Sequence, residues 1–330
     1  MSTDDTQQQS FENRTDLSGV EKLVNAIRGE IGKIIVGQHE MVDLLIAALL
    51  ANGHVLIEGV PGVAKTLTTK LLAQTIASDF SRIQFTPDLM PADVTGTSVF
   101  NPKTTDFEFK QGPVFSNIVL IDEINRSPAK TQAALFEVME ERQITVDGKT
   151  YIMDEPFMVV ATQNPIEHEG TYRLPEAQLD RFLFRIDVPY PSLDEEVEIL
   201  AGSHKRKNRL NIQDLAKVVS AEDIKAQQDV VSGIHVEPDL MTYIAKIIQN
   251  TRNSSSVSIG ASPRAAVFVM RASQARAAMN GRDFITPEDV KEVINPVLRH
   301  RITLTPEREM EGMKPDQVIQ RILEKVEVPR

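Results

Sequence analysis

The segment Gly59–Thr66, with the sequence GVPGVAKT, constrains the fold more than any other part of this chain. It follows a short apolar run, His54–Glu58, and precedes a helical pattern over Lys65–Ala77. Loops of the form G-x-x-x-x-G-K-[ST] between a strand and a helix bind phosphate, because their backbone N–H groups and the helix N-terminus attract an anion. Ala64 replaces the second glycine, and a methyl group is the smallest possible departure from the pattern. The segment predicts a triphosphate site in an α/β fold.

Two residues of this loop have specific expected tasks. Lys65 is expected to reach the β- and γ-phosphates, and the Thr66 hydroxyl is expected to hold Mg²⁺. The alternative is a glycine-rich turn with an incidental lysine, which the strand before it and the helix after it disfavour. The remaining positions predicted to contact the nucleotide are Gly59, Val60, Pro61, Gly62, Val63, Ala64 and Leu67.

Asp122 and Glu123 follow a second apolar run, Ile118–Ile121. Such a run predicts a buried strand, and the carboxyl ends of parallel strands are where ligands bind in open α/β sheets. Asp122 is expected to complete the Mg²⁺ site, and Glu123 to polarise the attacking water as a general base. Two acids that merely open a surface loop are the alternative. No N-K-x-D sequence that would select guanine is present, so ATP is the expected nucleotide.

Short apolar runs alternate with helical patterns or long insertions up to residue 188, which predicts a parallel sheet covered by helices on both faces. The runs are His54–Glu58, Ser81–Phe85, Ile118–Ile121, Phe157–Ala161 and Phe182–Val188. After Pro189-Tyr190-Pro191 only helical signals follow, so the second part is predicted to be all-α. We therefore expect a polar disordered tail over 1–16, a nucleotide-binding α/β core over 17–191 and a helical lid over 192–330.

Local signals place several ends of elements. Ser18-Gly-Val-Glu21 is typical of a capping box, and Ser262-Pro263 and Thr286-Pro287 are typical of an N-cap followed by proline. Gly281 is suited to ending a helix. Asp147-Gly148 is a two-residue turn signal between Gln143–Val146 and Lys149–Met153, which predicts a hairpin.

Composition excludes several classes of protein. Cys is 0, so disulfides, thiolate metal sites and cysteine nucleophiles are excluded, and a reducing, cytoplasmic location is expected. The longest apolar stretch, Met41–Ala51, is interrupted by Asp43 and is too short to span a membrane. Met1–Asp16 lacks the order of a signal peptide. With 36 basic against 47 acidic residues the net charge is −11, which argues against non-specific nucleic-acid binding.

Other residue groups receive ordinary interpretations. Histidines 54, 204, 235 and 300 lack metal-ligand spacing and are expected to be surface or partly buried residues. The basic run His204–Arg209 is interpreted as a solvated helix face. Met139, Met153 and Met158 are expected to fill the core.

Beyond these residues, the chain over roughly Leu17–His300 resembles the AAA+ ATPases, and most closely their MoxR family. In that family the phosphate loop has an alanine before Lys-Thr, and Ala64 occupies this position here. The other matching segments are Ile35–Gln38, Phe85–Pro91, Asp122–Arg126, Ala161–Pro165, Leu174–Phe182 and Gly260–Ala265. Arg173 departs from the resemblance, because the family usually has proline at that position.

The resemblance implies roles for further residues. Asn164 matches sensor 1, Arg181 the arginine finger that acts on a neighbouring subunit, and Arg264 the sensor 2 arginine that reaches over the γ-phosphate. Val36 and Gly37 match the segment beside the adenine. The hairpin at 143–153 matches the hairpin before sensor 1, and 95–112 matches the insertion in helix 2. Arg126 could also face a neighbour.

The family further implies a function and an assembly. We expect an ATPase that forms a hexameric ring and acts as a chaperone-like motor on other proteins, with a von Willebrand factor A domain partner on a separate chain. The alternatives are a nucleotide-gated scaffold with little turnover, and the motor subunit of a metal-chelatase-like or DNA-translocating complex.

Overall fold

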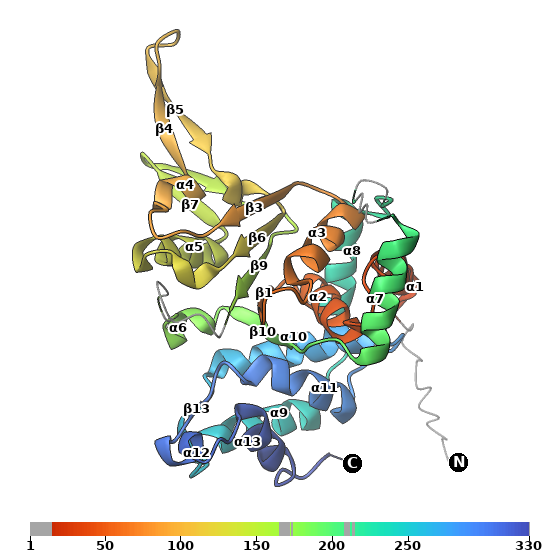
Figure 1. Cartoon of the computed structure of the whole chain (residues 1–330). Helices are drawn as coiled ribbons and strands as arrows, with labels where there is room; N and C mark the ends of the chain where they lie inside the picture. The colour runs from red at the N-terminus through yellow and green to blue at the C-terminus, as the bar shows by residue number, and fades with distance from the viewer. Residues whose placement is uncertain (1–14, 165–171, 173, 208–211, 213–214, 330) are drawn as a thin grey trace, which may run out of the picture.

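A five-stranded sheet forms the centre of the molecule, and all of its neighbouring strands run parallel. The computed structural model describes residues 15–164, 172, 174–207, 212 and 215–329 (Figure 1). Most of the predicted tail, and Arg173, therefore lie outside the described residues. The strand order across the sheet is β10 (Phe182–Val188), β1 (His54–Gly59), β9 (Met158–Gln163), β6 (Ile118–Asp122) and β3 (Phe80–Gln84).

The predicted strands are present, with ends that differ by one or two residues. The three central strands are buried over nearly their whole length, as expected for apolar runs covered on both faces. The order predicted for the fold class, an α/β core followed by a mainly helical part, is confirmed. Because β1, β9 and β6 are parallel neighbours, the residues that follow them emerge at one edge of the sheet.

The first part of the chain has helices both before β1 and between the strands that follow it. The α-helices are α1 (Ser18–Ile31), α2 (His39–Leu50), α3 (Lys65–Thr75), α4 (Pro91–Thr95), α5 (Ala129–Glu141) and α6 (Glu176–Leu179), with 3₁₀ turns η1 (Pro113–Phe115) and η2 (Ile124–Arg126). The capping box predicted at Ser18 is wrong, because the N-cap is Leu17 and Ser18 is already helical. The Ser18 amide donates instead to Asp16 Oδ1 at 2.9 Å.

Two hairpins project from the β3 side of the molecule (Figure 1). The predicted turn is present, with Asp147 and Gly148 at φ 51° and 76° between β7 (Gln143–Val146) and β8 (Lys149–Ile152). The segment expected only as an insertion in helix 2 also forms a hairpin, β4 (Gly96–Asn101) with β5 (Asp106–Gln111). The rings of Phe109 and Tyr151 lie 4.5 Å apart, so the two hairpins contact each other.

The second part is mainly helical. Its helices are α7 (Leu193–Lys205), α8 (Ala221–Ser232), α9 (Pro238–Asn253), α10 (Pro263–Met279), α11 (Pro287–Leu298), α12 (Pro306–Met310) and α13 (Pro315–Leu323). Ser262 and Thr286 are the N-caps of α10 and α11, and Gly281 has φ 69° beyond the end of α10, as predicted.

The expectation of a strand-free second part needs a correction. β11 (Val219–Ser220) pairs with β2 (Ile76–Ala77), and β12 (Val257–Ile259) pairs with β13 (Thr303–Leu304). Pairs this short carry no apolar run that a sequence pattern could show. The first pair also explains why the helix predicted over Lys65–Ala77 ends at Thr75.

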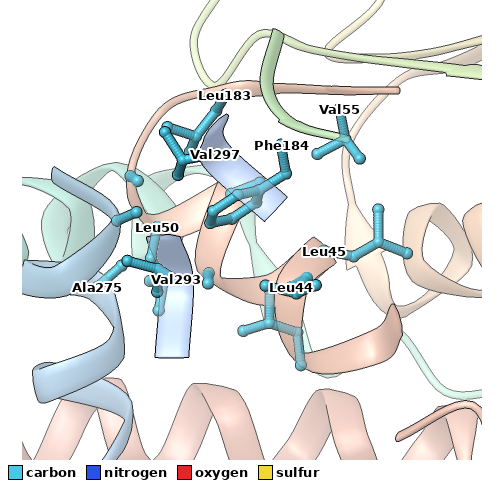
Figure 2. Packing of buried hydrophobic residues seen from close by; sticks show 14 of the residues in the cluster. Leu44, Leu45, Leu50, Val55, Leu183, Phe184, Ala275, Val293 and Val297 are labelled. Atoms are coloured by element: carbon cyan, nitrogen blue, oxygen red, sulfur yellow. The ribbon is translucent and has the colours of Figure 1, made fainter. Parts of the chain in front are cut away.

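The apolar core lies on both faces of the sheet. One cluster covers the face of α4 and α5, and includes Met139 and Met153 as predicted. The other joins α1 and α2 to the helices α8 to α11 and α13. Figure 2 shows Phe184 of β10 packed among Leu45 of α2 and Val293 and Val297 of α11. The helices after residue 191 thus share a core with the first two helices, and the domain boundary at 191 stays a prediction.

Two of the four histidines are more buried than expected. His54 is 5% exposed and His300 is 6% exposed. The Val159 amide donates to His54 Nδ1 at 3.0 Å, and Nε2 lies 3.1 Å from the Met139 carbonyl, an arrangement that fits the neutral ring protonated at Nε2. His300 Nε2 lies 3.0 Å from the Phe182 carbonyl. Both rings tie strand ends to neighbouring elements.

Candidate nucleotide site

The predicted phosphate loop connects the end of β1 to the start of α3. Gly62 has φ +89°, and the space where a Cβ would stand is open. Ala64 has φ 63° and ψ 18°, a left-handed conformation that glycine adopts freely and that costs an L-residue about 1 kcal/mol. The Lys65 ammonium donates to the Gly59 carbonyl and, at 3.3 Å, to the Gln163 carbonyl. The loop is therefore an open backbone turn with a lysine held across it.

Asp122 lies beside this loop at the end of β6. Its Oδ1 accepts hydrogen bonds from the Thr66 hydroxyl at 2.8 Å and from the Thr162 hydroxyl at 3.2 Å. Its Oδ2 lies 2.6 Å from Arg82 Nε. The sequence placed Thr66 and Asp122 in one metal site, and the structure brings these two side chains into contact.

Glu123 has φ 57° and ψ 53°, so the chain turns sharply after the strand. Its backbone amide donates to Thr162 Oγ1 at 3.1 Å, which fixes the turn on the neighbouring strand. Its Oε2 accepts from Gln84 Nε2 at 2.8 Å and lies 3.0 Å from Arg126 Nε. In this state the carboxylate is therefore held by an amide and a guanidinium on its own chain.

Sequence reasoning missed Arg82, Gln84 and Thr162 as neighbours of the two acids. All three lie on strands that flank β6, and Gln84 pairs with Asp122 in the register of the sheet. Strand order could have suggested them, because polar residues at the ends of neighbouring strands meet at one edge. Asn164 directly follows β9, is 8% exposed, and comes next to the carbonyl that Lys65 contacts.

A cavity of about 300 Å³ lies next to the loop. Predicted residues Val36, Gly62, Val63, Ala64 and Leu67 line it, whereas Gly37 does not. Gly37 faces Glu195 of α7, where a Cβ would collide with the carboxylate. The other lining residues are Ile34, Ile35, Gln38, Pro191, Ile199, Ser203 and Arg206.

Helix α7 forms one wall of this cavity through Ile199 and Ser203, and Arg206 follows directly after its end. Within the run His204–Arg209, interpreted as a solvated face, His204, Lys205 and Lys207 are exposed and Arg206 is partly buried beside the cavity, while Asn208 and Arg209 lie outside the described residues. Helical spacing of Ile199, Ser203 and Arg206 is the signal that could have been found.

Arg181 and Arg264 lie at the other end of the strands. Arg181 immediately precedes β10, and the register pairs Phe182 with His54, whereas Val188 pairs with Gly59. Six residues of strand therefore separate the arginines from the loop, a span of roughly 16 Å. Arg264 is held at this end because Ser262, the N-cap of α10, donates to Asp180 at 3.0 Å.

Both arginines contact one carboxylate, that of Glu140 near the end of α5. Arg264 Nη2 lies 2.5 Å from Oε1 of Glu140, and Arg181 Nε lies 3.4 Å from Oε2. This contact holds Arg264 away from the phosphate loop of its own chain, and its expected place over a γ-phosphate stays a prediction. We call this end of the sheet, with Glu140, Arg181 and Arg264, the arginine edge. We call the opposite end, with Gly59–Thr66, Asp122, Glu123 and Asn164, the nucleotide edge.

Arg301 is the buried support of the arginine edge. Its guanidinium donates to Asp180 Oδ1 at 2.7 Å and to the carbonyls of Asp180, Phe182, Leu183 and Val297. Burial lowers the pKa of Arg301 to about 10, against the opposing effect of Asp180, so the group stays charged at neutral pH. It fixes the chain around Arg181 to the end of α11.

The described residues contain neither a cluster of metal-binding side chains nor a helix that could span a membrane. No group of three or more His, Asp or Glu side chains in that part of the chain could hold a metal ion. A metal at the nucleotide edge would therefore depend on phosphate oxygens as well as on Thr66 and Asp122. None of the described helices is long and apolar enough to cross a membrane.

The parallel sheet, the phosphate loop after β1 and the acidic pair after β6 define a P-loop nucleotide-binding protein of the ATPase type. Family comparison agrees: residues 54–184 match the ATPase family associated with various cellular activities (AAA), and residues 249–322 match the AAA lid domain.

Individual relatives show to which family of these ATPases the chain belongs. The chain is 47% identical to YeaC of Bacillus subtilis, an uncharacterized protein, over 91% of this chain and 92% of that one. It is 44% identical to the chaperone MoxR1 of Mycobacterium tuberculosis, over 91% of this chain and 81% of that one. A crystal structure of a candidate ATPase from Cytophaga hutchinsonii superimposes with a TM-score of 0.87 at 43% identity, covering 95% of this chain and 97% of that one. The chain belongs to the MoxR family of AAA+ ATPases.

Proposed function

We propose that this chain binds ATP with Mg²⁺ and hydrolyses it at the nucleotide edge, with Arg181 and Arg264 supplied by a second copy. The observation that carries the proposal is the separation of the two edges within one chain. A single copy places the loop and the acids together, but holds both arginines roughly 16 Å away along β1 and β10. A complete site therefore needs two copies.

The residues of the nucleotide edge fit a magnesium triphosphate. The open Gly62 turn and the N-terminus of α3 suit phosphate oxygens, and Lys65 lies across the same turn. The Thr66 hydroxyl and the Asp122 carboxylate already touch, so both could hold one small cation. When bound, Mg²⁺ would neutralise charge on the β- and γ-phosphate oxygens. The cavity walled by Val36 and Ile199 would take the adenine.

Glu123 is the proposed general base, and Asn164 would orient the attacking water. Gln84 and Arg126 hold the Glu123 carboxylate in this state. Both of these contacts are made to Oε2, so they leave Oε1 available to accept a proton from water. Arg126 contacts Glu123 of its own chain, and a contact with a neighbouring subunit stays a prediction.

The arginine edge would act on the γ-phosphate of the adjoining subunit. A guanidinium that stabilises the charge of the transferring phosphoryl group accelerates such reactions by about 10³- to 10⁵-fold. Contacts in which one edge meets the opposite edge of the next copy are head-to-tail and close into rings. A hexameric ring is proposed on the basis of the family.

The output of the ATPase is proposed to be chaperone-like work on other proteins. The relative MoxR1 is named a chaperone, and the two projecting hairpins offer surfaces that a client or a von Willebrand factor A domain partner could contact. The net charge of −11 supports a protein client rather than a nucleic acid.

Subunit mixing tests the division of the site between copies. Lys65→Ala subunits keep the arginines but lose the phosphate loop, and Arg181→Ala subunits keep the loop but lose the finger. Each variant alone should hydrolyse ATP at a rate near background. In a random equal mixture, about one quarter of head-to-tail contacts join an intact loop to an intact arginine, so about a quarter of wild-type activity should return.

Phosphate release measures the activity, and sedimentation confirms that both variants fold and associate. A mixture of associated subunits that stays inactive would refute the shared site. Wild-type oligomer that binds ATP without turnover would instead favour the nucleotide-gated scaffold.

A further inference from the structure

Glu140 is the acidic centre of the arginine edge. It lies in the last turn of α5 and is half-exposed, with side-chain exposure of 36%. Its two oxygens contact different arginines: Oε1 contacts Arg264 Nη2 and Oε2 faces Arg181 Nε. These arginines come from segments 41 and 124 residues further along the chain, so a single carboxylate brings together two distant parts of the sequence.

Helix formation does not explain an acid at this position. The C-terminal end of a helix carries partial negative charge, so a carboxylate there is unfavourable and a basic residue would be preferred. Glu141, the next residue, is subject to the same penalty and is exposed, and its side chain has no hydrogen bond or ion pair within the described part of the chain. What distinguishes Glu140 is its contact with both guanidiniums.

The geometry of the Arg181 contact leaves that arginine able to bind a second anion. Glu140 faces the inner nitrogen of Arg181, Nε, so the outer edge of that guanidinium is not used by this contact. One carboxylate between two guanidiniums leaves a net charge of +1. Without it, two like charges would lie side by side and repel each other.

The backbone around the two arginines is fixed separately. Asp180 accepts from Ser262 Oγ at 3.0 Å and from Arg301 Nε at 2.7 Å, which holds the start of α10 against the chain before β10. These contacts set where the two Cα atoms lie. The direction of the long side chains still depends on Glu140, the carboxylate that both of them contact.

We propose that Glu140 is a positioning residue that aligns Arg181 and Arg264 as a pair toward the triphosphate held by the neighbouring subunit. The proposal rests on the function proposed above. Glu140 itself contacts the two arginines and is not assigned any contact with substrate.

The test uses the two-component mixture, in which only one subunit type donates arginines. Glu140→Gln keeps the size of the side chain and removes its charge. Placed in the Lys65→Ala donor, it should lower kcat about tenfold and leave KM for ATP within about twofold, because misaligned groups slow the reaction while the loop of the other subunit still binds ATP. Placed in the Arg181→Ala acceptor, it should change neither value.

Glu141→Gln in the donor is the matched control, since it removes the same charge from the same helix end. It should leave kcat unchanged. Equal losses of kcat with Glu140→Gln in the donor and in the acceptor would show a general structural role and overturn the proposal. An unchanged kcat with Glu140→Gln in the donor would also overturn it. If the unmodified mixture itself regains no hydrolysis, the proposed shared site fails before Glu140 is tested, so the two failures are distinguishable.

Discussion

The nucleotide edge and the arginine edge are built from the same strands in different ways. At the nucleotide edge, the residues of interest lie at or just after the carboxyl ends of β1, β6 and β9, which are parallel neighbours in the sheet. At the arginine edge, Glu140, Arg181 and Arg264 belong to three elements and meet only through tertiary contacts. The comparison teaches that the two edges, which the proposed function makes the two halves of one reactive site, are held apart within one chain.

The largest expected effect comes from the nucleotide edge. Glu123→Gln should lower kcat by about 10³-fold, within the range that general bases contribute, because the amide cannot accept a proton from water. ATP binding should persist, since Lys65, Thr66 and Asp122 are unchanged. Single-turnover phosphate release and calorimetric titration measure the two properties on the same oligomer.

Gln84→Leu is a companion to the Glu123→Gln variant. It removes the 2.8 Å contact to Glu123 without altering an assigned phosphate or metal contact. Undiminished hydrolysis by Glu123→Gln would exclude Glu123 as the base and would weaken the distinction between the two edges.

Much of the nucleotide edge could be predicted because its chemistry is local in sequence. A loop between a strand and a helix, or an acid after an apolar run, keeps its meaning without knowledge of the rest of the fold. For this reason the sequence could suggest that Thr66 and Asp122 lie together, and their side chains are in contact in the structure. The strands themselves followed from their apolar runs, and only their ends differed.

The arrangement of the arginine edge could not be predicted in the same way. Family resemblance named Arg181 and Arg264 but did not show which end of the sheet Arg264 occupies. That depends on how α10 docks, through Ser262 on Asp180 and through the core shared with α2. Arg206 was missed for a similar reason, since only the packing of α7 makes its basic run part of a cavity wall.

The pH dependence of stability should show a second difference between the edges, because the buried His54 supports the arginine edge. Burial, reinforced by Arg142, lowers the pKa of His54 to about 3 from an ordinary value of 6.5. Below pH 6.5 the unfolded chain therefore binds a proton that the folded protein excludes. The free energy of unfolding should fall by roughly 1.4 kcal/mol per pH unit from this residue, or about 2 kcal/mol between pH 7 and pH 5.

Denaturant unfolding at pH 7, 6 and 5 measures this slope. His54→Gln should reduce it by about one proton, whatever its effect on stability at pH 7. His235→Gln is the control for replacing a histidine by glutamine, since that side chain is 63% exposed. An unaltered slope in His54→Gln would show that the ring is not held neutral in the folded protein. His300, whose pKa burial also lowers, would add to the wild-type slope in the same direction.

The smallest expected effect concerns the cavity beside the loop, and it tests whether α7 belongs to the nucleotide edge. Ile199 of α7 lines that cavity, while Val197 on the same helix is 58% exposed and does not. Ile199→Ala should remove about 1 kcal/mol of apolar contact with the base, which raises Kd for ATP about fivefold and leaves kcat at saturation unchanged. Val197→Ala should bind like wild type. Titration with a fluorescent ATP analogue measures both, and equal affinities for the two variants would place the adenine elsewhere and remove α7 from the nucleotide edge.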